Sequence, residues 1–511
     1  MSSRKKERKK EGFCVAEKMS NTARTETDSS DDSETEASGT TINDPRSPSF
    51  LKQALRKAGI DGAVEFAVLA KLWQLLTGPL TQLILVVSFS TATQDYYYAF
   101  SSLLGLQVFV ELGLHVVLIN VSSHEWSRLS LQDGQIVGDA AAKSRVISLG
   151  RMMLRWYGIA SLIFAATITT AGLLFFGKTG IDAGGDVPLR ENVAWLAPWI
   201  GLVIINGLQL PLLPLTAILE GCNQLSVINR VRFWQAVAGT LVVWLALSCG
   251  FGLWSLVASA SIRLAGELYL VAVKYRPFFT AFRSSPEKDQ VDWKHEILPL
   301  QWRIAVQGIL LWLANSMPLL LIFRNRPEGA AAQLGMTWTI LTALQAASLA
   351  WIETRRPVFG VLIAAGKFRE LDQLFFRTMR LSMVIMTAAV ICFSLTVWWI
   401  GTRNEWLIER LAGRMLPVGP TAMFATAMVL LQFALCTNLY VRAHKRDPYL
   451  LASIVSSLTV AALQVWFGKK FGSSGVAAGY LLGIACVQVP LWTLIWVRTR
   501  KEWHAPEPGD A

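Results

Sequence analysis

Long apolar runs dominate the chain beyond residue 60, and each has roughly the length that spans a bilayer. A transmembrane helix needs about 20 consecutive apolar residues, because the hydrocarbon core is about 30 Å thick. The twelve runs cover residues 64–90, 95–120, 152–176, 194–219, 232–250, 253–274, 304–323, 331–352, 379–400, 417–440, 449–467 and 474–496. The period-two alternation of a transmembrane β-barrel is absent. The pattern therefore predicts an all-α polytopic membrane protein with about twelve transmembrane helices.

The two halves of this pattern echo each other. "GFGLWSLVASASI" joins the fifth run to the sixth, and "KFGSSGVAAGYLL" joins the eleventh to the twelfth. Six runs per half is an even number, so we expect two parallel six-helix repeats around a central cavity. The expected domains are an N-terminal lobe at 59–276, a cytoplasmic linker at 277–301 and a C-terminal lobe at 302–500, followed by a polar tail at 501–511.

The distribution of lysine and arginine predicts the topology. Arg145, Arg276 and Arg355 lie in connecting segments of one side, whereas residues 91–98 and 251–252 on the other side contain neither residue type. Positive residues favour the cytoplasmic side of a membrane. We therefore expect both the N-terminus and the C-terminus in the cytoplasm.

Residues 1–58 differ from the rest of the chain, because they hold 22 of its 84 charged residues. The basic "RKKERKK" precedes the acidic, serine-rich "ETDSSDDSETE", and apolar residues are too few to form a core. This composition predicts a disordered cytoplasmic tail. The net charge of +12 then reflects cytoplasmic segments that contact membrane lipids, and we expect no nucleic-acid partner.

Polar residues inside the apolar runs are the best functional candidates, because each buried charge costs about 2.5–3.5 kcal/mol on insertion scales. Arg263 and Glu267 are spaced to neutralise each other, while Lys71 and Arg303 are placed to extend toward head groups, so structural roles are alternatives. The predicted substrate-binding residues are Lys71, Gln74, Gln82, Asn206, Gln209, Arg263 and Arg303.

The second run carries Gln107, Glu111 and His115 at i, i+4 and i+8, within an arc of about 80° on one helical face. Histidine titrates near neutral pH, so Glu111 and His115, with Glu267, are predicted to couple transport to protons. A hydrogen-bonded structural brace is the alternative for this row.

Three local patterns predict helix geometry. Gly78-Pro79 in the first run and Pro318 in the seventh favour bends, which would make these two spans gates. Gly475, Gly479 and Gly483 form a GxxxGxxxG series, which is typical of close helix packing.

Motifs for chemistry are missing. The chain has five histidines but no HExxH, no GxSxG and no complete P-loop, and its six cysteines are scattered. We therefore expect no enzymatic activity, no cofactor and no metal site.

Four segments resemble a known family. "YYYAFSSLLGLQVFVELGLHVVLINVSSHEW" and "LPLTAILEGCNQLSVINRVRF" resemble bacterial O-antigen and polysaccharide flippase-like transporters, and "LPLQWRIAVQGIL" and "RRPVFGVLIAAGKFRELDQLFFRTMR" resemble members linked to lipopolysaccharide biosynthesis. This polysaccharide transport family belongs to the multidrug/oligosaccharidyl-lipid/polysaccharide exporter (MOP) superfamily. The resemblance covers about Ala63 to Arg500, and the long charged N-terminal tail departs from it.

The resemblance implies translocation of a lipid-linked oligosaccharide or polysaccharide precursor across the bacterial cytoplasmic membrane by alternating access. The implied substrate is a polyprenyl-diphosphate-linked glycan, and the implied partners are glycosyltransferases or a polymerase of polysaccharide assembly. Two alternatives stay open, namely a MATE-like cation-coupled exporter of small molecules and a non-transporting scaffold for polysaccharide assembly.

Overall fold

The structure is a computed structural model that describes residues 62–177, 193–283, 290–403, 405–444 and 448–503. The predicted N-terminal tail lies outside these residues, as does most of the predicted C-terminal tail. Helices make up nearly all of the described chain, as expected where every backbone polar group in the bilayer must be satisfied within its own segment.

The first half contains the short hairpin β1–β2 among its helices. The elements are α3 (Gly62–Ser88), α4 (Thr91–Leu104), η1 (Gly105–Gln107), α5 (Val108–Glu111), α6 (Leu114–Trp126), β1 (Leu129–Gln132), β2 (Gln135–Gly138), α7 (Ala140–Phe176), α8 (Leu196–Gln209), η2 (Leu210–Leu212), α9 (Leu213–Gly221), α10 (Leu225–Ser248), α11 (Trp254–Leu268), η3 (Tyr269–Lys274), α12 (Arg276–Thr280) and η4 (Ala281–Arg283).

The second half is helical throughout its described residues. Its elements are η5 (Trp293–Ile297), α13 (Leu298–Asn315), α14 (Met317–Asn325), α15 (Ala330–Glu353), α16 (Arg356–Ala364), α17 (Phe368–Gly401), α18 (Trp406–Ala412), α19 (Val418–Ala443), α20 (Leu450–Gly483), η6 (Ile484–Gln488) and α21 (Val489–Trp503).

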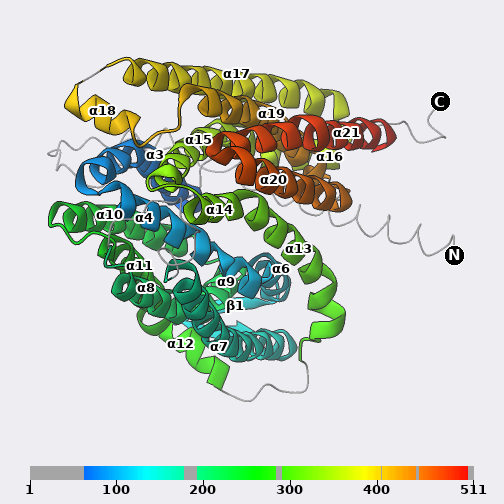
Figure 1. The fold of residues 1–511 in the computed structure, drawn as a ribbon. Coiled ribbons are helices and arrows are strands. Elements are labelled where there is room, and N and C mark those ends of the chain that lie inside the picture. The colour runs from blue at the N-terminus through cyan, green and yellow to red at the C-terminus, as the bar shows by residue number, and fades with distance from the viewer. Residues whose placement is uncertain (1–61, 178–192, 284–289, 404, 445–447, 504–511) are drawn as a thin grey trace, which may run out of the picture. The chain divides into compact units, whose positions relative to one another are not determined.

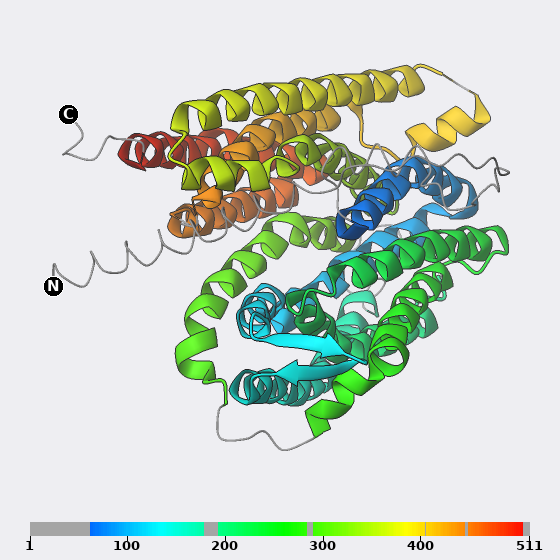
Figure 2. The same cartoon turned by 180° about the vertical axis from the view of Figure 1, so that it is seen from behind.

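The helices of each half pack mainly with one another. In the first half α10 packs on α3 and α11, and α6 packs on α9; in the second half α17 and α20 pack on α19. Helix α4 contacts α14 and α15 of the second half, and α5 contacts α13. Figure 1 shows α4, α14 and α15 close together between the two halves. Figure 2 shows the same arrangement from behind, with the hairpin β1–β2 beside α7 and α12.

Nine of the described helices are long and apolar enough to cross a membrane, and the bent pair α4–α6 makes a tenth. One of the nine, Leu450–Trp503, has 54 residues and reverses direction at Gly472, so it supplies two spans. Helix α15 is not one of these ten, but its 24 residues are also enough to cross a membrane, so we count it as a further span. Counted in this way, the described residues supply the twelve predicted spans and confirm the predicted fold class.

The reversal at Gly472 creates a tight helical hairpin. Gly472 has φ 65° and ψ −143°, a conformation that favours glycine. A Cβ added at Gly479 would lie 2.6 Å from the Leu463 carbonyl oxygen, and one at Gly475 would lie 2.0 Å from the Phe467 carbonyl oxygen. The two legs therefore touch backbone to backbone, which confirms the close packing predicted for the GxxxGxxxG series.

The second span is broken where the sequence predicted one continuous face. Leu112 and Gly113 have φ 45° and 70°, and the helices on either side meet at a bend of 42°. The prediction that Gln107, Glu111 and His115 share a single helical face is therefore wrong, because its assumption of an unbroken helix fails between Glu111 and His115.

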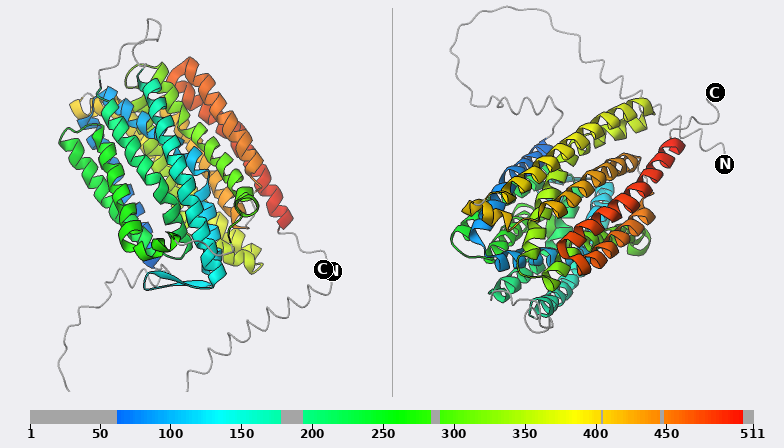
Figure 3. Two further views of the ribbon diagram at one scale, coloured as in Figure 1. Left: turned by 90° about the horizontal axis from the view of Figure 1, so that it is seen from below. Right: turned by 45° about the horizontal axis from the view of Figure 1, so that its top comes forward.

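The seventh span breaks at Ser316 between α13 and α14, with Pro318 in the first turn of α14. This confirms the bend predicted near Pro318. Helix α3, in contrast, is assigned without interruption through Gly78 and Pro79. Figure 3 (left) shows the hairpin β1–β2 and the end of α21 at the same end of the helices.

Replacement of Gly479 by alanine is expected to destabilise the protein by about 1–3 kcal/mol, because the added methyl group would push apart two backbones that touch. Thermal unfolding of the purified protein in detergent measures this loss. Gly419→Ala is the matched control, because that helical glycine has open space around it. Equal unfolding temperatures for the two variants would contradict the expectation.

Candidate functional site

A cavity of about 210 Å³ lies between α4 of the first half and α13–α15, α19 and α20 of the second half. Its lining includes Ser101 and Ser102 from α4, Asn315 and Ser316 from the break in the seventh span, and Trp338 from α15. Ser101 comes ten residues after the start of α4, so it lies about 15 Å from that end of the helix. The cavity is therefore well inside the helical region, at the junction of the two halves.

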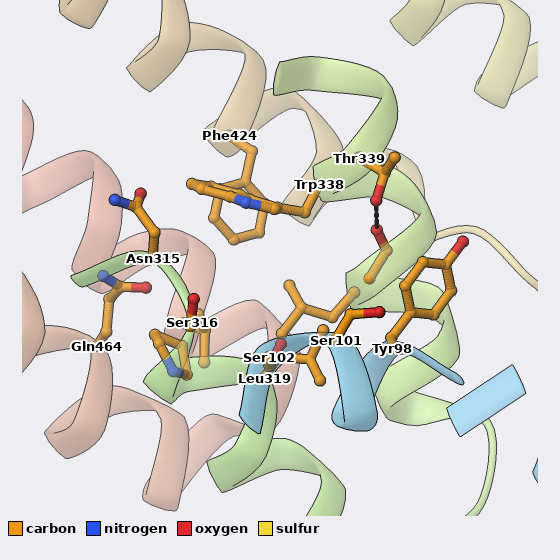
Figure 4. A pocket seen from close by; sticks show the side chains of 14 residues that line it. Tyr98, Ser101, Ser102, Asn315, Ser316, Leu319, Trp338, Thr339, Phe424 and Gln464 are labelled. Carbon is orange, nitrogen blue, oxygen red and sulfur yellow. Dashed lines mark hydrogen bonds between the residues drawn. The ribbon is translucent and has the colours of Figure 1, made fainter. Parts of the chain in front are cut away.

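The lining combines aromatic rings with uncharged polar groups. Figure 4 shows Asn315 and Gln464 on one side of the cavity, Thr339 and Tyr98 on the other, and Trp338 at its border. None of the lining residues is Asp, Glu, Lys, Arg or His. The cavity therefore offers shape and hydrogen bonds to a ligand but no charge.

The wall toward α13 is closely packed. Trp312 donates its indole N–H to the carbonyl of Ser102 at 3.1 Å, and a Cβ at Gly105 would lie 2.8 Å from the same indole nitrogen. A Cβ at Gly113 would lie 2.4 Å from the Ile304 side chain. Gly105, next to the cavity, and Gly113, farther along the span, thus let the second and seventh spans approach closely.

A second group of polar side chains lies inside the first half. Gln107 donates to Glu111 at 2.6 Å. Beyond the break, His115 Nε2 lies 3.7 Å from Glu220 Oε2, and Arg232 donates to the other oxygen of Glu220 at 2.5 Å. Helix packing thus joins α6, α9 and α10 through one carboxylate.

Glu267 extends this group on α11. It is buried, and its Oε2 atom has no hydrogen-bond partner among the described residues. Arg232 and Glu220 lie within electrostatic range of its carboxylate. Two of the three predicted coupling residues, His115 and Glu267, therefore lie beside Glu220 and Arg232, whereas Glu111 is hydrogen-bonded to Gln107 on the other side of the helix break.

The predicted substrate-binding residues do not gather in the cavity. Only Gln82 adjoins it, by accepting a 2.6 Å hydrogen bond from the Tyr98 hydroxyl. Asn206 is buried and donates to the Leu202 carbonyl of its own helix. Gln209 is half-buried on α8. The remaining four, Lys71, Gln74, Arg263 and Arg303, are exposed.

The proposed neutralisation of Arg263 by Glu267 is not seen, because no ion pair joins them in the described part of the chain. Arg263 lies near Tyr97 instead. The Arg303 guanidinium sits 5.8 Å from the ring of its neighbour Trp302. These cations are therefore not neutralised by carboxylates in this conformation.

Sequence reasoning missed Trp338, Asn315 and Gln464, which line the cavity from three separate helices. The one local signal was the "NSMP" stretch at 315–318, where two small polar residues lie shortly before a proline in the first turn of the next helix. Within the described residues, no group of three or more His, Cys, Asp or Glu side chains is placed to hold a metal ion.

Comparison with solved structures identifies the fold. The chain is similar to an inward-facing multidrug resistance MATE transporter of the MOP superfamily, at TM-score 0.58 and 15% identity over 86% of this chain and 99% of that chain. It is also similar to the lipid II flippase MurJ in an inward closed conformation, at TM-score 0.54 and 12% identity over 85% and 87% of the two chains.

An outward-facing MATE transporter of the MOP superfamily gives a lower TM-score, 0.51, at 14% identity over 86% and 96% of the two chains. No protein-family model and no curated protein matches the sequence. The chain therefore has the fold of these transporters.

Removal of the Arg232 guanidinium should leave Glu220 buried beside Glu267 without its cation. The Arg232 side chain is 38% exposed, and the Glu220 side chain is 9% exposed. Because water reaches Arg232, we expect Arg232→Gln to cost about 1–2 kcal/mol, less than the roughly 3–5 kcal/mol of a fully buried pair. Thermal unfolding measures it.

The double variant Glu220→Gln, Arg232→Gln should recover most of that loss, because neither charge is then left alone. Arg230→Gln on the same helix is the control, since this exposed residue makes a cation–π contact with Phe66 and no ion pair among the described residues. A double variant as unstable as the sum of the two single variants would refute the pairing.

Proposed function

We propose that this chain moves a lipid-linked oligosaccharide across the bacterial cytoplasmic membrane by alternating access, with both termini in the cytoplasm. The MOP fold and the similarity to a lipid II flippase support this proposal. The sequence resemblance to polysaccharide exporters supports the glycan as cargo. The observation that carries alternating access is a polar contact between the two halves at one end of the helices.

This contact, which we call the outer lock, consists of Asp95, Gln94, Arg410 and Arg414 with the backbone groups that they bind. The Asp95 carboxylate is fully buried and accepts hydrogen bonds from the N–H groups of Gly329 at 2.9 Å and Ala332 at 2.5 Å. A carboxylate is favourable at a helix N-terminus. A residue of the first half thus caps helix α15 of the second half.

In the opposite direction, two arginines of the second half bind the end of α3 in the first half. Arg414 donates to the carbonyls of Phe89 at 2.6 Å and Ser90 at 2.9 Å, and to the Gln94 side chain at 2.6 Å. Arg410 donates to the carbonyls of Val86, Val87 and Phe89. Arginines of the second half therefore bind the carbonyls at the C-terminal end of a helix in the first half.

The outer lock ties the halves together only while that end is closed. Separation would leave Asp95, Arg414 and two helix ends without partners, unless water enters the opened space. An outward-open state supplies that water, and an inward-facing state does not need it. The lock is therefore a natural gate for an alternating-access cycle.

Lys71, Arg263 and Arg303 are the proposed contacts of the substrate diphosphate, because they are exposed cations without ion-pair partners among the described residues. Gln74, Gln82, Asn206 and Gln209 remain proposed glycan contacts. For coupling, we propose that protons bind Glu111, His115 and Glu267, with Glu220 beside the last two.

A small-molecule exporter is the second candidate, favoured by the TM-score to the MATE transporter. Such a cargo is typically cationic and needs acidic groups at its site, whereas the described cavity lining contains none. A non-transporting scaffold would work through the N-terminal tail, which lies outside the described residues.

Reconstitution tests the proposed function directly. We expect full-length protein in proteoliposomes to expose a fluorescent polyprenyl-diphosphate oligosaccharide to an external quencher faster than empty vesicles do. Arg263→Ala should slow this exposure about tenfold by removing one diphosphate contact. Arg498→Ala, an exposed cation near the C-terminus of α21, is the control. Efflux of cationic dyes without glycolipid movement would favour the exporter instead.

Asp95→Ala should shift the protein toward outward-open states. Charge-assisted hydrogen bonds contribute about 1.5–3 kcal/mol each, so losing them would change the ratio of states by about tenfold or more. The measurement is labelling of a cysteine placed at Ser101 by a membrane-impermeant maleimide added from outside. Glu409→Gln, on the exposed side of α18, is the control. Unchanged labelling in Asp95→Ala and Arg414→Gln would rule out the lock as a gate.

A further inference from the structure

We propose that the cavity beside Ser316 is a subsite for one neutral monosaccharide unit of the transported glycolipid. This inference rests on the proposed function, since it identifies which part of the substrate the cavity holds. Three properties of the described lining carry it, namely its charge, the direction of its hydrogen bonds and its aromatic rings.

The absence of charge from the lining selects a neutral group. A diphosphate or a cationic drug in this space would lie among uncharged side chains, without the counter-charge that burial of an ion requires. An acyl or polyprenyl chain would bind the apolar part of the lining but would leave its amides and hydroxyls without partners from the ligand. A neutral polar group fits where neither an ion nor a hydrocarbon does.

The hydrogen-bond directions favour a ligand rich in hydroxyl groups. Ser101 donates to the Tyr97 carbonyl at 3.0 Å and Thr339 to the Gly335 carbonyl at 2.8 Å. Their hydroxyl protons are committed to their own helices, so the oxygens keep lone pairs to accept from a ligand.

The two amides of the lining show the same direction. Asn315 Nδ2 donates to the Leu311 carbonyl at 2.7 Å, and Gln464 Nε2 donates to the Ala314 carbonyl at 2.9 Å. Each side chain keeps its carbonyl oxygen as an acceptor and its second N–H as a donor. Together with the hydroxyl oxygens of Ser101 and Thr339, the cavity presents several acceptors and two amide donors, which the hydroxyl groups of a sugar can satisfy because each both donates and accepts.

The aromatic border supplies a flat surface for a sugar ring. Trp338 is held by edge contacts with Phe424 at 5.6 Å and Tyr480 at 5.2 Å between ring centroids. The face of an aromatic ring is negative, so it attracts the weakly positive C–H groups on the face of a pyranose. Because neighbouring rings fix its orientation, the Trp338 indole binds without first being ordered.

The volume limits the occupant to one ring. Pockets for drug-sized ligands measure about 300–1,000 Å³, and this cavity has about 210 Å³. We therefore assign it to a single sugar unit, with the rest of the glycan and the diphosphate outside it. The broken seventh span forms one side of the subsite, as discontinuous helices do in other transporters.

The test uses the full-length protein in nanodiscs and a panel of glucose, galactose, mannose and N-acetylglucosamine, with glucuronate and inorganic diphosphate as charged comparisons. Saturation-transfer NMR reports sugar binding. We expect at least one neutral sugar to bind saturably, and Trp338→Ala to weaken that binding by about tenfold or more. Trp351→Ala is the matched control, because Trp351 lies on the same helix, is 52% exposed and does not line the cavity.

Two further variants separate the subsite from folding. Thr339→Val removes one acceptor at nearly constant volume and should weaken sugar binding, while Trp338→Phe keeps a ring and should retain part of it. Binding that survives Trp338→Ala, a stronger response to glucuronate or diphosphate, or no saturable binding by any neutral sugar would each overturn the proposal.

Transport measured in parallel distinguishes this inference from the proposed function. Glycolipid movement that is unchanged in Trp338→Ala and Thr339→Val would leave the transport function standing and remove the subsite. Sugar binding that depends on Trp338, without any glycolipid movement by the wild-type protein, would remove the transport function and leave the subsite.

Discussion

A backbone N–H or C=O without a partner costs several kcal/mol in the hydrocarbon core of a membrane, and the rest of this structure depends on that constraint. Every interruption of a helix must therefore lie against protein. The break at Leu112–Gly113 packs on Ile304, and the break at Ser316 faces the cavity. At the Gly472 reversal, Arg326 binds the carbonyls of Gly468 and Lys469. The sites where the helices deviate are thus the sites where the two halves or the two legs of a hairpin meet.

Three arginines of the second half have the same structural role. Arg326, Arg410 and Arg414 all donate to main-chain carbonyls near the C-terminal ends of helices, where positive groups are favourable. Arg326 does so within the second half, whereas Arg410 and Arg414 do so across the junction with the first half. The C-terminal end of α3 is therefore capped by side chains of the other half. An alternating-access cycle would have to release these contacts.

Features that depend on one segment of the chain could be predicted from the sequence, whereas contacts between distant segments could not. The spans were predictable because length and apolarity along one segment decide them, and the packing of Gly475 and Gly479 because small residues at helical spacing permit close approach. The contact between His115 and Glu220 joins residues 105 positions apart, which no local spacing indicates. The cavity collects Ser101, Trp338 and Gln464 from different helices, so its composition emerges only when those helices pack.

The separation of charged and neutral groups within the protein has a physical consequence for the proposed cycle. A cation buried in a cavity that closes would lose its hydration and need a carboxylate nearby. The exposed Lys71, Arg263 and Arg303 lie outside the described lining of this cavity. The lining of the cavity beside Ser316 carries no charge, and each of its two amides already donates one hydrogen bond to a helix carbonyl. The halves can therefore close at the outer lock without burying an ion in the cavity, and a hydroxyl-rich ligand or water can satisfy the remaining donors and acceptors in either state.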